Sequence, residues 1–279
     1  MLWWGCEQKK EAPPKAKRRK EKNESYWKCR NPYWYLCEND YEGLKIFSFI
    51  TSKLMQRLDK YLANLGLASR REIPALCKMG YILVNGETVK KPDFKLFGGE
   101  ILDFQGQEIK VLERVYVILY KSAGYISSDE DEFGYPSYKK QMLDCPYANL
   151  LHVAGRLDVD TEGLLLLSND GQFIHQVISP KRDKEKEYEV WLQSSISSVD
   201  CEQLKNWVQL DDGYFTKPAK VQQLEEKKIL LTITEGKYHQ VKRMLEAVGN
   251  KVVYLKRLRI GEWTLAGLEK GEWKLVTVS

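Results

Sequence analysis

A polar turn placed directly before an apolar run constrains this chain more than any other feature. Residues 154–167 read AGRLDVDTEGLLLL. The final leucines form a short, wholly apolar run, as a buried strand would, whereas the stretch between Gly155 and Gly163 is too polar to be buried unless its groups are paired. The sequence therefore predicts a buried strand that starts at a polar turn, and a partner that neutralises Asp158.

The residues alone leave two interpretations of this turn. Asp and Thr beside Gly form ordinary turns and helix caps, which composition favours; an Arg with two carboxylates is also a place where chemistry can occur. The string GRLDVDTEGLLLL resembles the active-site motif of pseudouridine synthases of the RsuA type, which modify ribosomal RNA. The resemblance implies that Asp158 is catalytic, either by attacking the ribose or the pyrimidine or by taking a proton from the sugar.

Length and composition indicate a soluble two-domain protein. The chain has 279 residues, enough for two separate cores. Its hydrophobic fraction is 43%, its charged fraction is 30%, and no apolar run approaches the roughly 20 residues that span a bilayer. The first residues lack the pattern of a secretory signal, so we expect a cytoplasmic protein without membrane contact. The six Cys and three His are too dispersed for a zinc site, and no metal is predicted.

The net charge of +5 is concentrated near the N-terminus. Residues 1–54 hold 12 of the 44 Lys and Arg and 7 of the 39 Asp and Glu, which leaves 32 of each sign in the rest of the chain. Because that remainder is formally neutral, bulk charge does not indicate a nucleic-acid partner there, and an RNA-binding surface must be local.

Residues 1–54 form a basic and aromatic extension that we expect to be disordered or not native. Residues 7–24 are rich in Lys, Arg and Glu and cannot bury a core, and residues 26–50 are crowded with aromatics without a regular period. One interpretation is an RNA-binding arm, since basic residues interleaved with aromatics hold phosphates and stack on bases. The other, which we favour, is an upstream in-frame sequence joined to the protein, because a recognisable unit begins at Met55.

Residues 55–110 predict a small domain of helices and hairpins. Leu58, Leu62 and Leu65 give an amphipathic helix that Gly66 ends, and Ser69 starts a capping box for a second helix that runs to about residue 78. Strand signals follow at 81–84 and 88–89 around an Asn-Gly turn, and again at 99–104, before a linker at 106–114.

This unit resembles the alpha-L RNA-binding module found in a small-subunit ribosomal protein. The matching strings are RLD at 57–59, SRR at 69–71, GYILVNG at 80–86 and GEI at 99–101. Such modules present basic groups of the helix pair to phosphates. The resemblance therefore implies phosphate contacts for Arg57, Lys60, Arg70, Arg71 and Lys78, although a solvated helix face remains the alternative for any single one of them.

Residues 114–279 are expected to form the catalytic domain, in which Asp158 needs a basic partner. The carboxylate must stay ionised although enclosed, and an opposite charge within about 4–6 Å lowers a carboxylate pKa by roughly 1–3 units. The family supplies this charge from a second motif, which here reads EGKYHQVKRML at 235–245. Lys242 occupies the usual basic position, and Arg243 is the alternative.

The resemblance assigns two further residues. Arg156 fills the gap in the RNA stack that the flipped target base leaves, which a guanidinium does by stacking and hydrogen bonding. Tyr188 lies in a predicted strand at 184–192, where an aromatic side chain usually belongs to the core; the family's Tyr stacks on the target uracil and helps a proton leave the carbon. Asp160 is expected to stabilise the turn through a hydrogen bond to the backbone.

A local basic surface is predicted near the C-terminus. Residues 235–259 hold seven Lys and Arg against two Glu. Phosphate contacts add salt-dependent affinity, and four of these residues are predicted to contact the RNA backbone. They are Lys251, Lys256, Arg257 and Arg259.

The resemblance covers residues 55–279 and implies an α+β fold, in which the alpha-L module joins a catalytic domain built on a mixed, mostly antiparallel sheet. No cofactor is implied. Strings TKPA at 216–219 and YHQVKRM at 238–244 look like the small-subunit enzyme, so we expect a monomer that modifies uridine 516 of 16S ribosomal RNA, within a ribosome assembly intermediate. The alternatives are a 23S target, or an RNA-binding assembly factor without catalysis.

Overall fold

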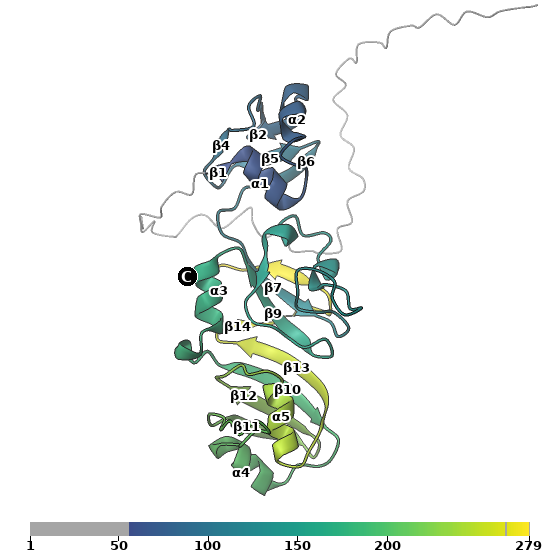
Figure 1. Ribbon diagram of the computed structural model, residues 1–279, viewed down its shortest axis with the longest axis vertical. Helices are drawn as coiled ribbons and strands as arrows, with labels where there is room; N and C mark the ends of the chain where they lie inside the picture. The colour runs from purple at the N-terminus through teal and green to yellow at the C-terminus, as the bar shows by residue number, and fades with distance from the viewer. Residues whose placement is uncertain (1–55, 266, 279) are drawn as a thin grey trace, which may run out of the picture. The chain divides into compact units, whose positions relative to one another are not determined.

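The computed structural model describes residues 56–265 and 267–278 (Figure 1). The extension predicted at 1–54 lies outside the described residues. In the part of the chain that is described, no helix is long and apolar enough to cross a membrane.

The first helix of the small domain is confirmed, and the start of the second is corrected. Helix α1 (Leu58–Leu65) follows β1 (Gln56–Arg57), buries its leucines and ends at Gly66, whose φ is 76°. Helix α2 (Ile73–Met79) begins later than predicted, and its N-cap makes no side-chain hydrogen bond. Ser69 instead lies in a preceding turn, where its N–H donates to the Glu72 carboxylate. The capping pattern therefore marks the approach to the helix and not its first residue.

A four-stranded antiparallel sheet completes this domain. Its order is β3 (Glu87–Thr88), β2 (Ile82–Val84), β5 (Ile101–Phe104) and β6 (Gln107–Lys110), while β4 (Lys95–Leu96) pairs with β1. The Asn-Gly hairpin is confirmed.

The predicted linker at 106–114 is wrong in its first part, which forms β6. Gln105 and Gly106 have φ of 55° and 89°, so they make a hairpin turn. Only Ile109 of β6 is buried, because β6 is an edge strand. Its polar sequence therefore gave no periodic signal.

The larger domain, predicted at residues 114–279, is built on a sheet of nine strands among the described residues. Its path is β11-β12-β10-β13-β9-β7-β15, with β14 on β13 and β8 on β9. The only parallel pairing in this sheet's described strands is β13 with β9, so the predicted mixed, mostly antiparallel sheet is confirmed. The strands are β7 (Tyr116–Lys121), β8 (His152–Val153), β9 (Glu162–Ser168), β10 (Lys186–Leu192), β11 (Lys220–Glu225), β12 (Lys228–Ile233), β13 (Val252–Ile260), β14 (Trp263–Thr264) and β15 (Trp273–Leu275).

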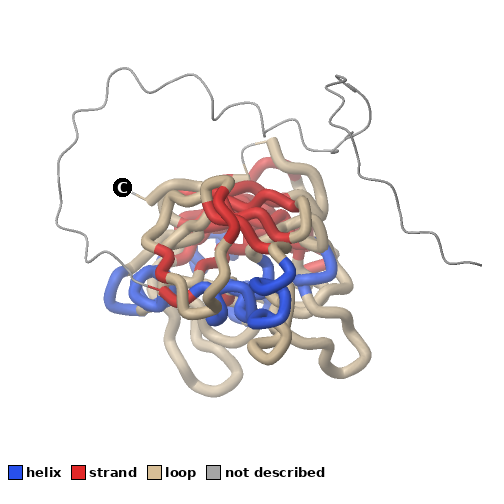
Figure 2. Tube along the Cα trace, turned by 90° about the horizontal axis from the view of Figure 1, so that it is seen from above, coloured by secondary structure: helices blue, strands red, loops and turns tan. Residues whose placement is uncertain are grey.

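Three α-helices of the described residues flank this sheet. Figure 2 draws helices in blue and strands in red. They are α3 (Gly171–Ile178), α4 (Ser198–Asn206) and α5 (Gln240–Ala247). Met244 and Leu245 of α5 pack in one buried cluster with Val190 of β10, and Phe173 of α3 packs in another with Leu164 of β9. Because α5 packs on β10, β10 pairs with β13, and β13 pairs with the start of β9, the N-terminus of α5 lies close to the turn before β9.

Candidate active site

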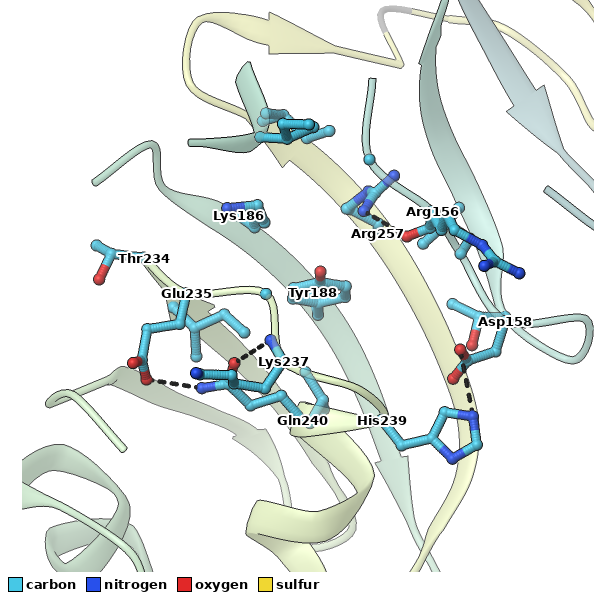
Figure 3. A pocket seen from close by; sticks show the side chains of 18 of the residues that line it. Arg156, Asp158, Lys186, Tyr188, Thr234, Glu235, Lys237, His239, Gln240 and Arg257 are labelled. Atoms are coloured by element: carbon cyan, nitrogen blue, oxygen red, sulfur yellow. Dashed lines mark hydrogen bonds and ion pairs between the residues drawn. The ribbon is translucent and has the colours of Figure 1, made fainter. Parts of the chain in front are cut away.

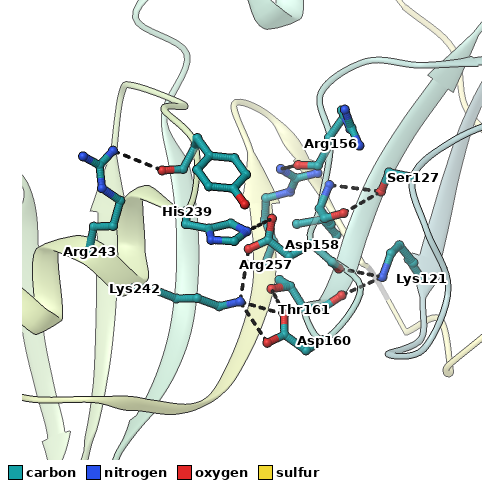
Figure 4. A network of polar contacts seen from close by, with 12 residues as sticks. Lys121, Ser127, Arg156, Asp158, Asp160, Thr161, His239, Lys242, Arg243 and Arg257 are labelled. Carbon is teal, nitrogen blue, oxygen red and sulfur yellow. Dashed lines mark hydrogen bonds and ion pairs between the residues drawn. The ribbon is translucent and has the colours of Figure 1, made fainter. Parts of the chain in front are cut away.

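The polar turn before β9 is fixed from the neighbouring strand β7. Lys121 is fully buried, and its Nζ donates to the backbone oxygens of Asp158 at 3.1 Å and Thr161 at 2.8 Å. The Ser127 hydroxyl accepts from the Leu157 N–H and donates to the Leu157 carbonyl. These contacts (Figure 4) satisfy polar groups that are costly to bury unpaired, and they hold the backbone of Asp158 in place.

The buried ammonium of Lys121 predicts a loss of activity above neutral pH. Burial lowers the pKa of Lys121 to about 8, against the opposing charges of Asp158 and Asp160. As the pH rises through about 8, the amine loses a donor and its charge, so we expect kcat to fall. The measurement is a pH–rate profile, in which Lys121→Met should be slower throughout and lack this limb.

The pH dependence of stability shows whether the fall in activity comes from this titration or from unfolding of the chain. Between about 8 and the ordinary lysine value near 10.4, the unfolded chain binds the proton and the folded chain does not. This group therefore makes the free energy of unfolding rise with pH, while activity falls. A limb that persists unchanged in Lys121→Met would contradict the assignment.

Strands β9 and β13 approach closely at the end of the same turn. Gly163 pairs with Arg257 in the parallel register, and its φ is 107°. The Arg257 side chain is 2% exposed; its Nε donates to the Leu164 carbonyl at 2.8 Å and its Nη1 to the Arg156 carbonyl at 3.3 Å. The prediction that Arg257 is a surface phosphate contact is therefore wrong, because the guanidinium is used inside the sheet.

The carboxylate of Asp158 meets two basic side chains from the start of α5. His239 Nε2 lies 3.4 Å from Oδ1, and Lys242 Nζ lies 3.2 Å from Oδ2. Burial lowers the pKa of Lys242, but its hydrogen bond to Asp160 and the charge of Asp158 outweigh this, so the net shift is upward. Lys242 is thus held as a cation beside Asp158.

The partner of Asp160 differs from the one predicted. Its carboxylate accepts two hydrogen bonds from Lys242 Nζ, at 2.7 and 2.9 Å, whereas a bond to the turn backbone was expected. Burial raises the pKa of Asp160, but the hydrogen bond to Lys242 and its charge outweigh it and lower the pKa overall. The two carboxylates of the turn therefore share one ammonium.

Arg243, the alternative partner, points elsewhere. Its guanidinium forms ion pairs with Asp211 and Asp212. These contacts raise the pKa of Arg243, through the hydrogen bond to Asp212 first. Of the two basic residues at this position, the geometry brings Lys242 to Asp158 and leaves Arg243 on the far side of the helix start (Figure 4).

A pocket of about 320 Å³ joins these groups to β10. Asp158, Arg156, Tyr188 and Lys242 all line it, as Figure 3 shows for the first three. Tyr188 is 7% exposed and lies between β12 and β13, opposite Arg257 in the register. Arg156 is exposed. Within residues 56–265 and 267–278, no three His, Cys, Asp or Glu side chains are grouped so that they could hold a metal ion.

The other predicted RNA contacts divide into exposed and paired residues. Arg259 binds Glu185 at 3.0 Å, and Lys256 Nζ lies 4.7 Å from the centroid of the Tyr120 ring, so both of these predicted RNA contacts already have a partner in the protein. Arg57 is exposed but pairs with the neighbouring carboxylate of the small domain at 2.8 Å. The remaining candidates are exposed: Lys60, Arg70, Arg71, Lys78 and Lys251.

Comparison with known families matches both parts of the chain. The family described as RNA pseudouridylate synthase matches residues 115–247, and the S4 domain matches residues 56–102. A solved structure described as a pseudouridylate synthase is 38% identical, with a TM-score of 0.56, and the match covers 79% of this chain and 96% of that one.

Relatives of similar sequence are also named as pseudouridine synthases. The chain is 42% identical over 225 residues to the ribosomal small subunit pseudouridine synthase A of Vibrio parahaemolyticus, covering 79% of this chain and 96% of the relative. It is 40% identical to the enzyme of that name from Escherichia coli, with the same 79% and 96% coverage, and 43% identical to an uncharacterized RNA pseudouridine synthase of Bacillus subtilis, covering 79% and 95%. The chain therefore belongs to the RNA pseudouridylate synthases, as an RsuA-type isomerase with an S4 domain.

Proposed function

We propose that this enzyme converts uridine 516 of 16S ribosomal RNA to pseudouridine, within a ribosome assembly intermediate. The observation that carries the catalytic part is the meeting of Asp158, Lys242 and Tyr188 at one pocket. The small-subunit target is supported by the names of the relatives from Vibrio and Escherichia. In this proposal, residues 55–110 bind RNA and residues 114–279 carry out catalysis.

The reaction breaks the bond between C1′ of the ribose and N1 of uracil and forms one between C1′ and C5. Asp158 is the nucleophile or base for this step, and the Lys242 ammonium, 3.2 Å from its Oδ2, holds the carboxylate at the pocket. Tyr188 offers a ring face to the uracil at the buried side of the pocket. Arg156, exposed beside it, occupies the place in the RNA that the flipped base leaves.

The experiment that tests this proposal maps carbodiimide-reactive pseudouridines in ribosomal RNA from cells with and without the protein. We expect one 16S position to lose its signal without the protein and to regain it only with the wild-type chain. A lost 23S position would replace the target, and an unchanged map would favour an assembly factor without catalysis.

The helix pair of the small domain is predicted to bind phosphates. Reversing two exposed charges with Arg70→Glu and Arg71→Glu should weaken RNA binding and reduce the slope of log affinity against log salt by roughly one to two, since each lost phosphate contact removes about 0.7–0.9. The matched control is Lys90→Glu with Lys91→Glu, also exposed in this domain but outside the helix pair. Equal losses in both double variants would show non-specific attraction instead.

A further inference from the structure

The pocket contains two cations whose hydrogen bonds go only to neutral acceptors. Arg257 donates to the carbonyls of Leu164 and Arg156, and Lys186 Nζ donates to the Lys184 carbonyl at 3.1 Å. The third nitrogen of the guanidinium, Nη2, is buried and has no hydrogen-bond partner among the described residues. A buried N–H without a partner is costly, so an orphan inside a ligand pocket indicates an acceptor that arrives with the ligand.

The two cations are close enough to repel each other. Burial lowers the pKa of Lys186, and the charge of Arg257 lowers it further. Glu235, which also lines the pocket, already accepts from Lys217 N–H at 2.8 Å and from Gln240 Nε2 at 2.9 Å. The charges of Asp183 and Glu235 act the other way and raise the pKa of Lys186. Asp183 pairs with Lys217, so Lys186 and Arg257 face one remaining carboxylate, that of Glu235, and this end of the pocket keeps a net positive charge, which favours an anionic ligand group over a neutral one.

The excess charge lies at the buried end of the pocket. The Asp158 side chain is 31% exposed, whereas Tyr188 is 7% and Arg257 is 2% exposed. In Figure 3, Lys186 and Arg257 lie above Tyr188 in the view, and His239 lies below it. We expect a nucleotide with its C1′ at Asp158 and its base against Tyr188 to turn the pyrimidine edge that carries the carbonyl oxygens towards the two cations.

The reaction supplies an anion at that edge. When the bond between C1′ and N1 breaks, its electron pair leaves with the base, and uracil becomes an anion whose charge is shared by its carbonyl oxygens. This holds whether Asp158 attacks C1′ or removes a proton from C2′, and attack on the pyrimidine ring likewise places negative charge on a carbonyl oxygen. The ring then turns and C5 forms the new bond to C1′, while the bond from Asp158 to C1′ breaks in the first route or C2′ takes its proton back in the second, and the C5 proton is lost. Donors that face the developing charge stabilise the transition state more than the neutral substrate.

We propose that Arg257 Nη2 and Lys186 Nζ bind the carbonyl edge of the target uracil and stabilise the detached uracil anion. This inference rests on the proposed placement of the catalytic residues in this pocket and on the family's reaction, and it is independent of which ribosomal RNA is modified. The two cations are catalytic residues in this assignment, because they contact the leaving base.

The test compares two planar ligands that have similar carbonyl edges but different charge. Barbiturate is an anion at neutral pH and uracil is neutral, so the wild-type chain should bind barbiturate more tightly by about tenfold or more, the worth of a hydrogen bond to a charged group. Lys186→Met, which keeps an unbranched side chain one atom shorter but removes the charge, should remove most of this preference. Lys220→Met, which removes an exposed lysine outside the pocket, should leave it unchanged.

A kinetic measurement on the same variants separates catalysis from folding. With an RNA substrate, Lys186→Met should lower the single-turnover rate by about 10²-fold, as loss of one donor to a developing charge does, while RNA affinity and melting temperature stay near those of Lys220→Met. Absence of a barbiturate preference in the wild type, or a preference that Lys186→Met retains, overturns the inference. Neither outcome affects the mapping experiment, so a wrong target and a wrong subsite are distinguishable.

Discussion

Asp158→Asn is expected to abolish pseudouridine formation while leaving RNA affinity within a few fold. The amide has nearly the same shape, but it is neutral and can neither attack carbon nor take a proton. Lys242 keeps its second partner, Asp160, so the site should stay assembled. Loss of a nucleophile or base lowers turnover by roughly four orders of magnitude or more. The measurement is single-turnover pseudouridine formation together with RNA binding.

Asp160→Asn is the matched control for this result. It removes the other carboxylate of the same turn, which is more exposed than Asp158 and also bound to Lys242. We expect its rate to stay within about tenfold of the wild type, because the pair between Lys242 and Asp158 remains and a largely exposed ion pair contributes little. Turnover that survives in Asp158→Asn, or an equal loss in both variants, would refute the central role of Asp158.

Local patterns predicted the elements whose own residues set their structure. The spacing of Leu58, Leu62 and Leu65 places one helical face in the core, and the apolar run after Gly163 forms a strand that is buried throughout. Both patterns predicted the structure correctly because burial of one helix face, or of both strand faces, can be read from the residues of the segment itself. The polar edge strand β6 has no such signal, since only Ile109 is buried.

Pairing between distant segments was predicted less well. The resemblance identified Lys242, but nothing in the sequence indicates that its ammonium also binds Asp160, 82 residues away in the chain. Lys121 ends an apolar strand, where a lysine normally reaches solvent. Its burial under the polar turn of Asp158 depends on the neighbouring strand β9. A count of charges likewise assigned Arg257 and Arg259 to a surface, whereas their partners are Leu164 on β9 and Glu185 just before β10.

The same dependence on tertiary contact makes Gly163 the position at which a small change should do the most damage to the fold. A Cβ there would lie 2.7 Å from the Arg257 backbone nitrogen and closer still to its carbonyl oxygen, so β9 and β13 would have to separate. The backbone φ of 107° adds strain for any side chain. We expect Gly163→Ala to lower the free energy of unfolding by at least about 4 kcal/mol, beyond the usual range for a point substitution.

Gly155→Ala separates the two causes, because it lies in the same motif with a φ of 93° but its Cβ would meet only the Ile178 side chain, at 3.8 Å. Backbone strain alone should cost about 1–2 kcal/mol there. Denaturant unfolding of both variants measures the difference, which is the cost of the close strand approach. If Gly163→Ala were no less stable than Gly155→Ala, β9 and β13 would not meet as described. The pairing of β9 with β13 would then not hold the Arg257 guanidinium in contact with the polar turn and with the pocket.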